Sequence, residues 1–334
     1  MWGINRSPDE FYDYLKDTII PTFNSTFIDD KLRNYGMDFF NLLFPTDEGE
    51  EIRLKFIEYM KKHISTKPIA DKEDLPLVGK DTQLLFVRFS ENKENLPFII
   101  PLGLVAVDIG NNNKQFIGHH FELETPLKYE TFSDKVQCIT HWVATLPNTN
   151  KLENAYKQIG NSSITDWNSR ALIYPNIKSF RGWVEIPLKD EIPTAIMVLA
   201  HYGDNILTDG NDMLPSASVL RRFSQPSVAI LDGCGTMKPG STDFIKQLNK
   251  NGVMTMIATS TSIAEPMGGD FIQCLGDVVK NIDKEEAKQM TISDVYIKTL
   301  NCLHLKKWGV NILRYSLLGD GNLGLCAPRK GGGK

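Results

Sequence analysis

Hydrophobic residues recur with the spacing of helices in the first sixty positions. Residues 7–23 begin with a serine, a proline and acidic residues, which is typical of a helix start. Residues 28–45 and 49–64 continue with apolar positions three and four apart, as on one face of a helix. A polar, proline-bearing stretch then covers residues 65–81. We therefore predict a helical N-terminal region over residues 1–75.

The period changes after that connector. Short runs with β spacing, broken by Asn, Gly and Pro, occupy residues 82–90, 96–109 and 114–127. They predict a small β-rich subregion between residues 76 and 130.

From residue 131 onwards, continuous apolar runs alternate with amphipathic ones. The apolar runs predict strands over residues 135–146, 194–203, 227–233 and 253–262. The amphipathic runs predict helices over residues 150–160, 217–224, 241–252, 268–282 and 292–309. Such alternation is typical of a mostly parallel sheet covered by helices on both faces. We predict an α/β core over residues 131–328, followed by a glycine-rich tail over 329–334.

Composition narrows the class of protein. The 334 residues include 41% hydrophobic positions, enough for a large core, and carry a net charge of −4. No basic stripe predicts direct nucleic-acid binding, and no run approaches the roughly 20 apolar residues of a membrane helix. The N-terminus lacks the apolar core of a signal peptide, so a cytoplasmic location is expected. The five cysteines are scattered and form no CxxC pair, so we expect neither a disulfide framework nor a zinc site.

Two predicted strands end in reactive side chains. The run "TAIMVLA" ends at His201, and "SVAILDG" ends at Cys234. About thirty residues separate the two ends, a normal length for the connection between neighbouring parallel strands. Because neighbouring strands lie about 4.8 Å apart, these side chains can approach hydrogen-bond distance at one edge of the sheet.

Proximity of these two groups would have a chemical consequence. A cysteine thiol with its ordinary pKa near 8.5 is only a few per cent ionised at neutral pH, and an imidazole can take its proton. Glycines beside the nucleophile (Gly203, Gly233 and Gly235) would admit a substrate backbone and leave main-chain N–H groups for an oxyanion. The alternative is a packed cysteine at a strand end and a histidine that caps another strand. Asp204 and Asn205 are further candidates for orienting the imidazole.

Four segments in order carry a family resemblance. They are "AIMVLAHYGDN", "VAILDGCGT", "KNGVMTMIATSTSI" and "LRYSLLGDGNLGL". Together they resemble the CHAT domain, a branch of the caspase-like cysteine peptidases related to separase and gingipain. Residues 30–326 take part in the resemblance. This sequence departs from the family pattern where Tyr202 stands between the histidine and the glycine, where "LDGC" replaces "LSAC", and where the last segment lacks a proline.

The resemblance implies a caspase-like fold and a peptidase. In it, His201 would be the general base and Cys234 the nucleophile, with oxyanion donors on the main chain around Tyr202, Gly203 and Gly233. An acid two positions before the cysteine lies in the specificity pocket of several relatives. Asp232 matches that position, which implies cleavage after Arg or Lys through a charge-assisted hydrogen bond. The alternative is that Asp232 caps its own turn.

Other motifs do not predict a cofactor or a metal. The glycines of "GDGNLG" (319–324) match a dinucleotide fingerprint in spacing, but too few residues follow them to form the required helix. His119 and His120 are adjacent on a β run and therefore point to opposite faces.

Competing functions remain at this point. The first is a cysteine endopeptidase with a specific protein substrate, which stays inactive until an activating protein or ligand binds the N-terminal region. In a microbial source, the resemblance implies a role in antiviral defence or cell death. The second is a catalytically silent scaffold or binding subunit, and a third is an acyl transferase that uses the same dyad.

Overall fold

The structure is a computed structural model of the whole chain. It describes residues 15–44, 46–63, 84–86, 102–119, 122–125, 127, 138–203, 205–237, 242–282 and 289–326.

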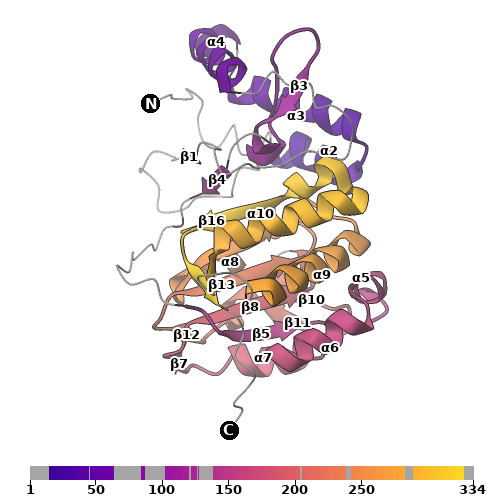
Figure 1. Cartoon of the computed structure of the whole chain (residues 1–334), viewed down its shortest axis with the longest axis vertical. Coiled ribbons are helices and arrows are strands. Elements are labelled where there is room, and N and C mark those ends of the chain that lie inside the picture. The colour runs from indigo at the N-terminus through magenta and orange to yellow at the C-terminus, as the bar shows by residue number, and fades with distance from the viewer. Residues whose placement is uncertain are drawn as a thin grey trace.

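An eight-stranded sheet forms the centre of the protein (Figure 1). Its spatial order is β1 (Leu84–Phe86), β4 (Glu122–Thr125), β16 (Tyr315–Gly319), β14 (Val253–Thr259), β13 (Ser227–Asp232), β8 (Thr194–Leu199), β5 (His141–Thr145) and β6 (Leu172–Tyr174). Every neighbouring pair is parallel except β14 with β16. The sheet therefore consists of two parallel blocks that meet at one antiparallel pair.

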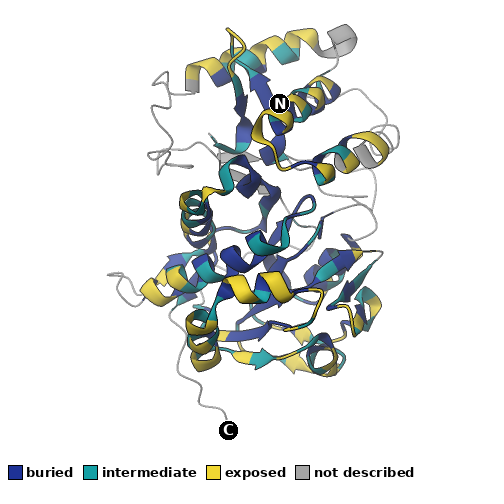
Figure 2. Cartoon of the chain, turned by 90° about the vertical axis from the view of Figure 1, so that its right-hand side faces the viewer, coloured by how far each residue is buried: buried dark blue, intermediate teal, exposed yellow. Residues whose placement is uncertain are grey.

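Helices cover both faces of this sheet. One face packs against α5 (Glu153–Ile159), α6 (Asn161–Arg170), α9 (Glu265–Asn281) and α10 (Ile292–Leu303). The other face packs against α7 (Ile177–Val184) and α8 (Thr242–Lys250). On β13, Val228 and Ile230 join the first group and Ala229 and Leu231 the second, as strand alternation requires. The outer sides of the helices carry the exposed residues (Figure 2).

The N-terminal helices form the upper part of the molecule in Figure 1. They are a π-helical turn (Leu15–Ile19), α2 (Ile20–Ser25), α3 (Asp29–Leu43) and α4 (Thr46–His63). Helix α3 packs against the hairpin of β2 (Ala106–Asp108) and β3 (Lys114–Phe116). Gly36 permits this contact, because a Cβ atom there would lie 2.5 Å from the carbonyl oxygen of Leu104. Short 3-10 helices flank the hairpin at Leu102–Leu104 and Ile117–His119.

Besides the β2–β3 hairpin, the described residues form three further small sheets. The chain after β8 folds into a meander of β9 (His201–Gly203), β10 (Ile206–Thr208) and β11 (Met213–Pro215). β7 (Lys189–Asp190) pairs with β12 (Arg222–Phe223), and β15 (Gln289–Thr291) pairs with β17 (Gly324–Cys326). The remaining helical turns are Ser216–Ser218, His304–Trp308 and Gly309–Arg314.

The predicted fold class is confirmed: the protein is α/β, with a mostly parallel sheet between two layers of helices. The helices predicted over 28–45 and 49–64 correspond to α3 and α4. The helix predicted over 217–224 is wrong, because Arg222–Phe223 forms strand β12 and only Ser216–Ser218 is helical. The start of the helix predicted over 7–23 lies outside the described residues, as do the whole connector 65–81 and the whole tail 329–334.

Candidate active site

His201 leaves the carboxyl end of β8 and begins β9. Alternation along β9 sends the Tyr202 side chain into the core, where its ring meets the edge of Phe244 at 6.3 Å. His201 and Gly203 therefore face the opposite side, and a Cβ atom on Gly203 would meet nothing within 4 Å. The tyrosine that separates the histidine from the glycine thus stays out of the site.

Cys234 leaves the carboxyl end of the neighbouring parallel strand, β13. The turn after it is fixed by backbone hydrogen bonds from Gly235 to Thr261 (3.0 Å) and from Met237 to Thr259 (2.9 Å). Gly233 lies so close to the end of β8 that a Cβ atom there would sit 1.9 Å from the Ala200 carbonyl oxygen. A glycine is therefore needed for the two strand ends to approach each other.

The structure brings His201 and Cys234 together. A side-chain hydrogen bond with Cys234 is the largest cause of a raised pKa for His201, while partial burial of the imidazole opposes that rise. The Cys234 thiol also lies 3.5 Å from the carbonyl oxygen of Ile263. Both side chains are partly exposed. An imidazole with a raised pKa next to a thiol favours the thiolate–imidazolium pair.

A main-chain carbonyl orients the imidazole. Nε2 of His201 donates to the carbonyl oxygen of Lys151 at 2.9 Å, which leaves Nδ1 for the thiol. Lys151 lies in the turn between β5 and α5, at the carboxyl end of the strand next to β8. Sequence reasoning missed this contact, because a carbonyl oxygen leaves no signal in residue type. The sequence indicated only that Lys151 follows a predicted strand, β5, which proves to be the neighbour of β8 in the sheet.

Asp204 and Asn205 are the two candidates that the sequence offers for that role. Asp204 falls outside the described residues. Asn205 has a left-handed backbone (φ 63°), and its buried Oδ1 has no hydrogen-bond partner.

Asp232 is fully buried beneath the site. Oδ1 accepts a hydrogen bond of 2.7 Å from the Tyr315 hydroxyl, whereas Oδ2 is buried without a partner. Burial raises the pKa of Asp232 to about 8, and the hydrogen bond from Tyr315 offsets only part of that rise. Neither oxygen accepts an N–H from its own turn, so the carboxyl group does not act as a turn cap.

The other cysteines differ from the sequence expectation. The structure pairs Cys138 with Cys326 and Cys274 with Cys302, with Cα–Cα distances of 5.4 and 5.7 Å. The expectation of unpaired thiols is therefore wrong, and sequence separations of 188 and 28 residues explain why no spacing motif indicated the pairs. All five cysteines lie in the described residues, and Cys234 is the one that forms no disulfide.

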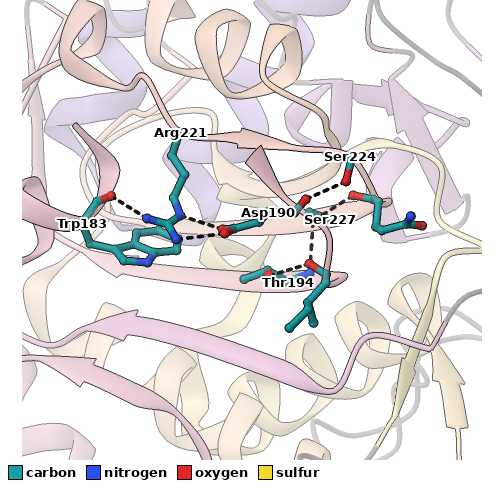
Figure 3. A network of polar contacts seen from close by, with 8 residues as sticks. Trp183, Asp190, Thr194, Arg221, Ser224 and Ser227 are labelled. Atoms are coloured by element: carbon teal, nitrogen blue, oxygen red, sulfur yellow. Dashed lines mark hydrogen bonds and ion pairs between the residues drawn. The ribbon is translucent and has the colours of Figure 1, made fainter. Parts of the chain in front are cut away.

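Arg221 belongs to a separate polar network at the other end of the central strands. It forms a two-pronged ion pair with Asp190 (2.6 and 2.9 Å) and lies over the ring of Trp183 (Figure 3). The same network reaches the first residues of β8 and β13, where the Ser227 hydroxyl accepts the N–H of Thr194 at 3.1 Å. These hydrogen bonds therefore connect β8 and β13 at their amino ends, opposite to the carboxyl ends that carry His201 and Cys234. Arg221 is held in place by this ion pair.

None of the described helices is long and apolar enough to cross a membrane.

Comparison with known proteins gives distant structural neighbours. No protein-family model matches the sequence, and no curated protein matches it. The complex of the RgpB pro- and mature domains from Porphyromonas gingivalis is similar over 98% of this chain and 79% of that one, at 9% identity and a TM-score of 0.44.

Two further neighbours match shorter parts. The Arg-specific cysteine proteinase gingipain R is similar over 57% of this chain and 48% of its own, at 12% identity and a TM-score of 0.40. The separase of the Saccharomyces cerevisiae separase–securin complex is similar over 57% of this chain and 12% of its own, at 13% identity and a TM-score of 0.39. This chain thus spans about half of gingipain R and a small part of separase. Its function follows from its own side chains.

Proposed function

We propose that this protein is a caspase-like cysteine endopeptidase, with Cys234 as the nucleophile and His201 as the general base. One observation carries the proposal: Cys234, the cysteine outside the two disulfides, is hydrogen-bonded to an imidazole whose other nitrogen is held by the Lys151 carbonyl. That arrangement of nucleophile, base and orienting group is the one that thiol-dependent acyl transfer requires.

The reaction would follow from these contacts. Nδ1 of His201 takes the thiol proton, and Sγ of Cys234 attacks the scissile carbonyl carbon, whose π electrons move onto oxygen. Collapse of this intermediate breaks the C–N bond, and the imidazolium gives its proton to the leaving amine. His201 then takes a proton from water, and the hydroxyl attacks the thioester. Expulsion of the Cys234 thiolate releases the acid and restores the thiolate–imidazolium pair.

The negative oxygen of the intermediate needs donors. The main-chain N–H groups around Tyr202, Gly203, Gly233 and Cys234 are our candidates. Gly203 supports this assignment because it is exposed and nothing lies within 4 Å of where its Cβ would be. Gly233 is needed for close packing against Ala200, and its main-chain N–H can still donate to the oxyanion.

Asp232 would select a basic side chain before the scissile bond. The support is its buried Oδ2, which has no partner and would gain one from an incoming Arg or Lys. A bound cation would also lower the pKa of this carboxyl from its raised value, so that binding and ionisation are coupled. Specificity for Arg or Lys would therefore follow from a buried acid that ionises when a cationic side chain binds to its unpartnered oxygen.

The N-terminal region would carry the control by a protein partner or ligand. Arg314 is fully buried and donates from Nη1 to the carbonyl oxygens of Phe23 and Ser262, each at 2.9 Å. The Asn24 side chain accepts the N–H of Ser262 at 2.7 Å. Helix α2 is thus hydrogen-bonded to the loop 260–263, both directly and through Arg314. The same loop contains the Ile263 carbonyl that contacts the Cys234 thiol. A partner that moves α2 would disturb that loop and, through it, the nucleophile. A role in defence or cell death is carried by the family resemblance.

The test is a peptide mixture that covers every residue before the scissile bond, read by mass spectrometry. The proposal expects cleavage after Arg or Lys by the wild type, and none by Cys234→Ala or His201→Ala. Cleavage after other residues would keep the dyad and remove the role of Asp232. Cleavage that survives in Cys234→Ala would overturn the dyad. If no peptide is cut, the assay is repeated with intact protein substrates, and the silent scaffold becomes the reading to test.

A further inference from the structure

Glu265 links the two helices next to the dyad. It is the first residue of α9, and its side chain reaches the first turn of α5. Oε1 accepts the N–H groups of Asn154 at 3.0 Å and Ala155 at 3.4 Å, and Oε2 accepts from the Asn154 side chain at 3.1 Å. The carboxylate therefore holds the start of α5 at three points.

The start of α5 is continuous with the carbonyl that orients His201. Lys151 comes two residues before the helix, and Leu152 between them is 2% exposed. Backbone hydrogen bonds from Leu152 to Thr149 (3.0 Å) and from Tyr156 to Leu152 (2.9 Å) make this stretch one bonded turn. The position of the Lys151 oxygen therefore depends on where α5 begins.

We propose that Glu265 is a positioning residue of the dyad, which holds the Lys151 carbonyl against His201 through the start of α5 and places a negative charge beside the imidazolium. This inference rests on the proposed peptidase function. It assigns Glu265 no contact with substrate.

The groups around the His201 imidazole support the electrostatic effect proposed for Glu265. The hydrogen bond with Cys234 raises the pKa of His201 most, the Lys151 carbonyl adds to the rise, and the Glu265 charge adds a smaller contribution. Cys234 faces the ring from the end of β13, and Glu265 acts on it from α9. The side chain of Lys151 is exposed, and Asp232 below has a pKa raised to about 8 by burial, so it is mostly neutral at pH 7. Among the described residues, Glu265 is thus the carboxylate that stabilises the imidazolium.

Loss of Glu265 should leave the two helices packed. Gln158 still donates to Asp270 at 2.9 Å, and Gly269 still allows α9 to lie against the Ala155 carbonyl. Glu265→Gln keeps an oxygen for the N–H groups of α5 and removes only the charge. Glu265→Ala removes both. Gln158→Ala breaks the other polar link between α5 and α9 and serves as the matched control.

The experiment has two readouts on the full chain. The first is the pKa of His201, followed by NMR of labelled histidine and assigned by the signal that disappears in His201→Gln. The second is kcat and KM on the best peptide. We expect both Glu265 variants to lower the pKa of His201, and Gln158→Ala to leave it unchanged. We expect kcat to fall roughly tenfold in Glu265→Ala and less in Glu265→Gln, with KM unchanged.

The outcomes separate the two proposals. An unchanged pKa of His201 in both Glu265 variants, or an equal change in Gln158→Ala, would overturn the positioning role whatever happens to cleavage. A lowered pKa in a protein that cuts no substrate would keep the positioning role and count against the peptidase. If Glu265→Ala fails to fold, Glu265→Gln gives the decisive pKa.

Discussion

The Tyr315 hydroxyl donates a 2.7 Å hydrogen bond to Oδ1 of Asp232, and both side chains are almost completely buried. The two residues come from different strands, β16 and β13, which lie on either side of β14. A carboxyl group that receives one hydrogen bond in such a place is costly to ionise. This acid, two residues before Cys234, is therefore mostly neutral at pH 7.

This neutrality makes stability depend on pH. The pKa of Asp232 is about 8 in the folded protein and near its ordinary value of 3.8 in the unfolded chain. Between these values the folded state holds a proton that the unfolded state releases. The contribution of Asp232 is thus fully present below about pH 4 and is lost as pH rises to 8, by up to about 1.4 kcal/mol per pH unit. Asp232→Asn should remove this loss.

Urea unfolding at pH 5, 6, 7 and 8 measures the effect. We expect the stability of Asp232→Asn relative to wild type to increase steadily across this series. Asp209→Asn is an informative contrast, because the buried Asp209 carboxylate accepts backbone N–H groups from Ile177, Asn211 and Asp212 and should lose stability when its charge is removed. A constant difference between Asp232→Asn and wild type at all four pH values would show that Asp232 is ionised in the folded protein.

The thiol should react at lower pH than an ordinary cysteine. The raised pKa of His201 means that the imidazolium persists above its usual range and stabilises the thiolate. Without a reductant the other four cysteines stay in disulfides, so iodoacetamide reports on Cys234 directly. We expect alkylation with a midpoint clearly below the ordinary value near 8.5, and a midpoint near 8.5 in His201→Gln. Identical profiles for the two proteins would mean that the pair is not coupled.

Gly233 should tolerate no side chain. A Cβ atom there would lie 1.9 Å from the Ala200 carbonyl oxygen and 2.6 Å from the Tyr202 ring. Because the first contact is with backbone, Gly233→Ala must move a strand end, and we expect a loss of roughly 1–3 kcal/mol or more in free energy of unfolding. Gly182→Ala is the control: it lies exposed in α7 with nothing within 4 Å, and a helical alanine there should gain about 0.5–1 kcal/mol. Equal stability of Gly233→Ala and wild type would contradict the packing.

Sequence pattern predicted the central strands well because burial on both faces leaves little choice of residue. β8, β13 and β14 are buried along their whole length and appear as continuous apolar runs. The proximity of His201 and Cys234 was predictable for the same reason, since each follows such a run at the carboxyl end of its strand.

Elements whose conformation depends on hydrogen bonds to residues far away in the sequence were not predictable from the local pattern of apolar positions. The segment 217–224 has helical spacing, yet Leu220 and Arg221 both donate their N–H groups to the Val184 carbonyl, and Arg222–Phe223 pairs with β7. Helix α7 and the meander β9–β11 were likewise not predicted. The Lys151 carbonyl, the partner of Asp232 and both disulfides depend on which strands become neighbours, which no local pattern contains.

The two disulfides predict how many thiols the denatured protein exposes before and after reduction. Denatured without a reductant, the protein should expose one thiol to alkylation, and five after reduction. The Cys274–Cys302 pair joins α9 to α10 across 28 residues, for which loop entropy gives a stabilisation of about 3–4 kcal/mol. Reduction of the wild type should therefore lower the urea midpoint. A count of five thiols before reduction would show that the pairs do not form.

Arg314 should couple the N-terminal helix to the loop beside the nucleophile. Its guanidinium donates to carbonyl oxygens of Phe23, Thr26 and Ser262, and burial lowers its pKa only to about 10, so it stays charged at neutral pH. Arg314→Gln cannot reach all of these acceptors. Each carbonyl left without a donor costs roughly 1–3 kcal/mol.

Hydrogen exchange locates that effect. In Arg314→Gln we expect faster exchange in α2 and in residues 260–263 together, and a changed alkylation rate of Cys234, whose thiol contacts Ile263. The matched control is Arg181→Gln, which removes an exposed i,i+4 ion pair with Glu185 and should change stability by no more than about 0.5 kcal/mol. Faster exchange in α2 alone, with the loop and the thiol unaffected, would show that the helix is only anchored by Arg314. Joint loosening would show that Arg314 couples helix α2 to the loop that contacts Cys234, which is the link that the proposed control by a partner requires.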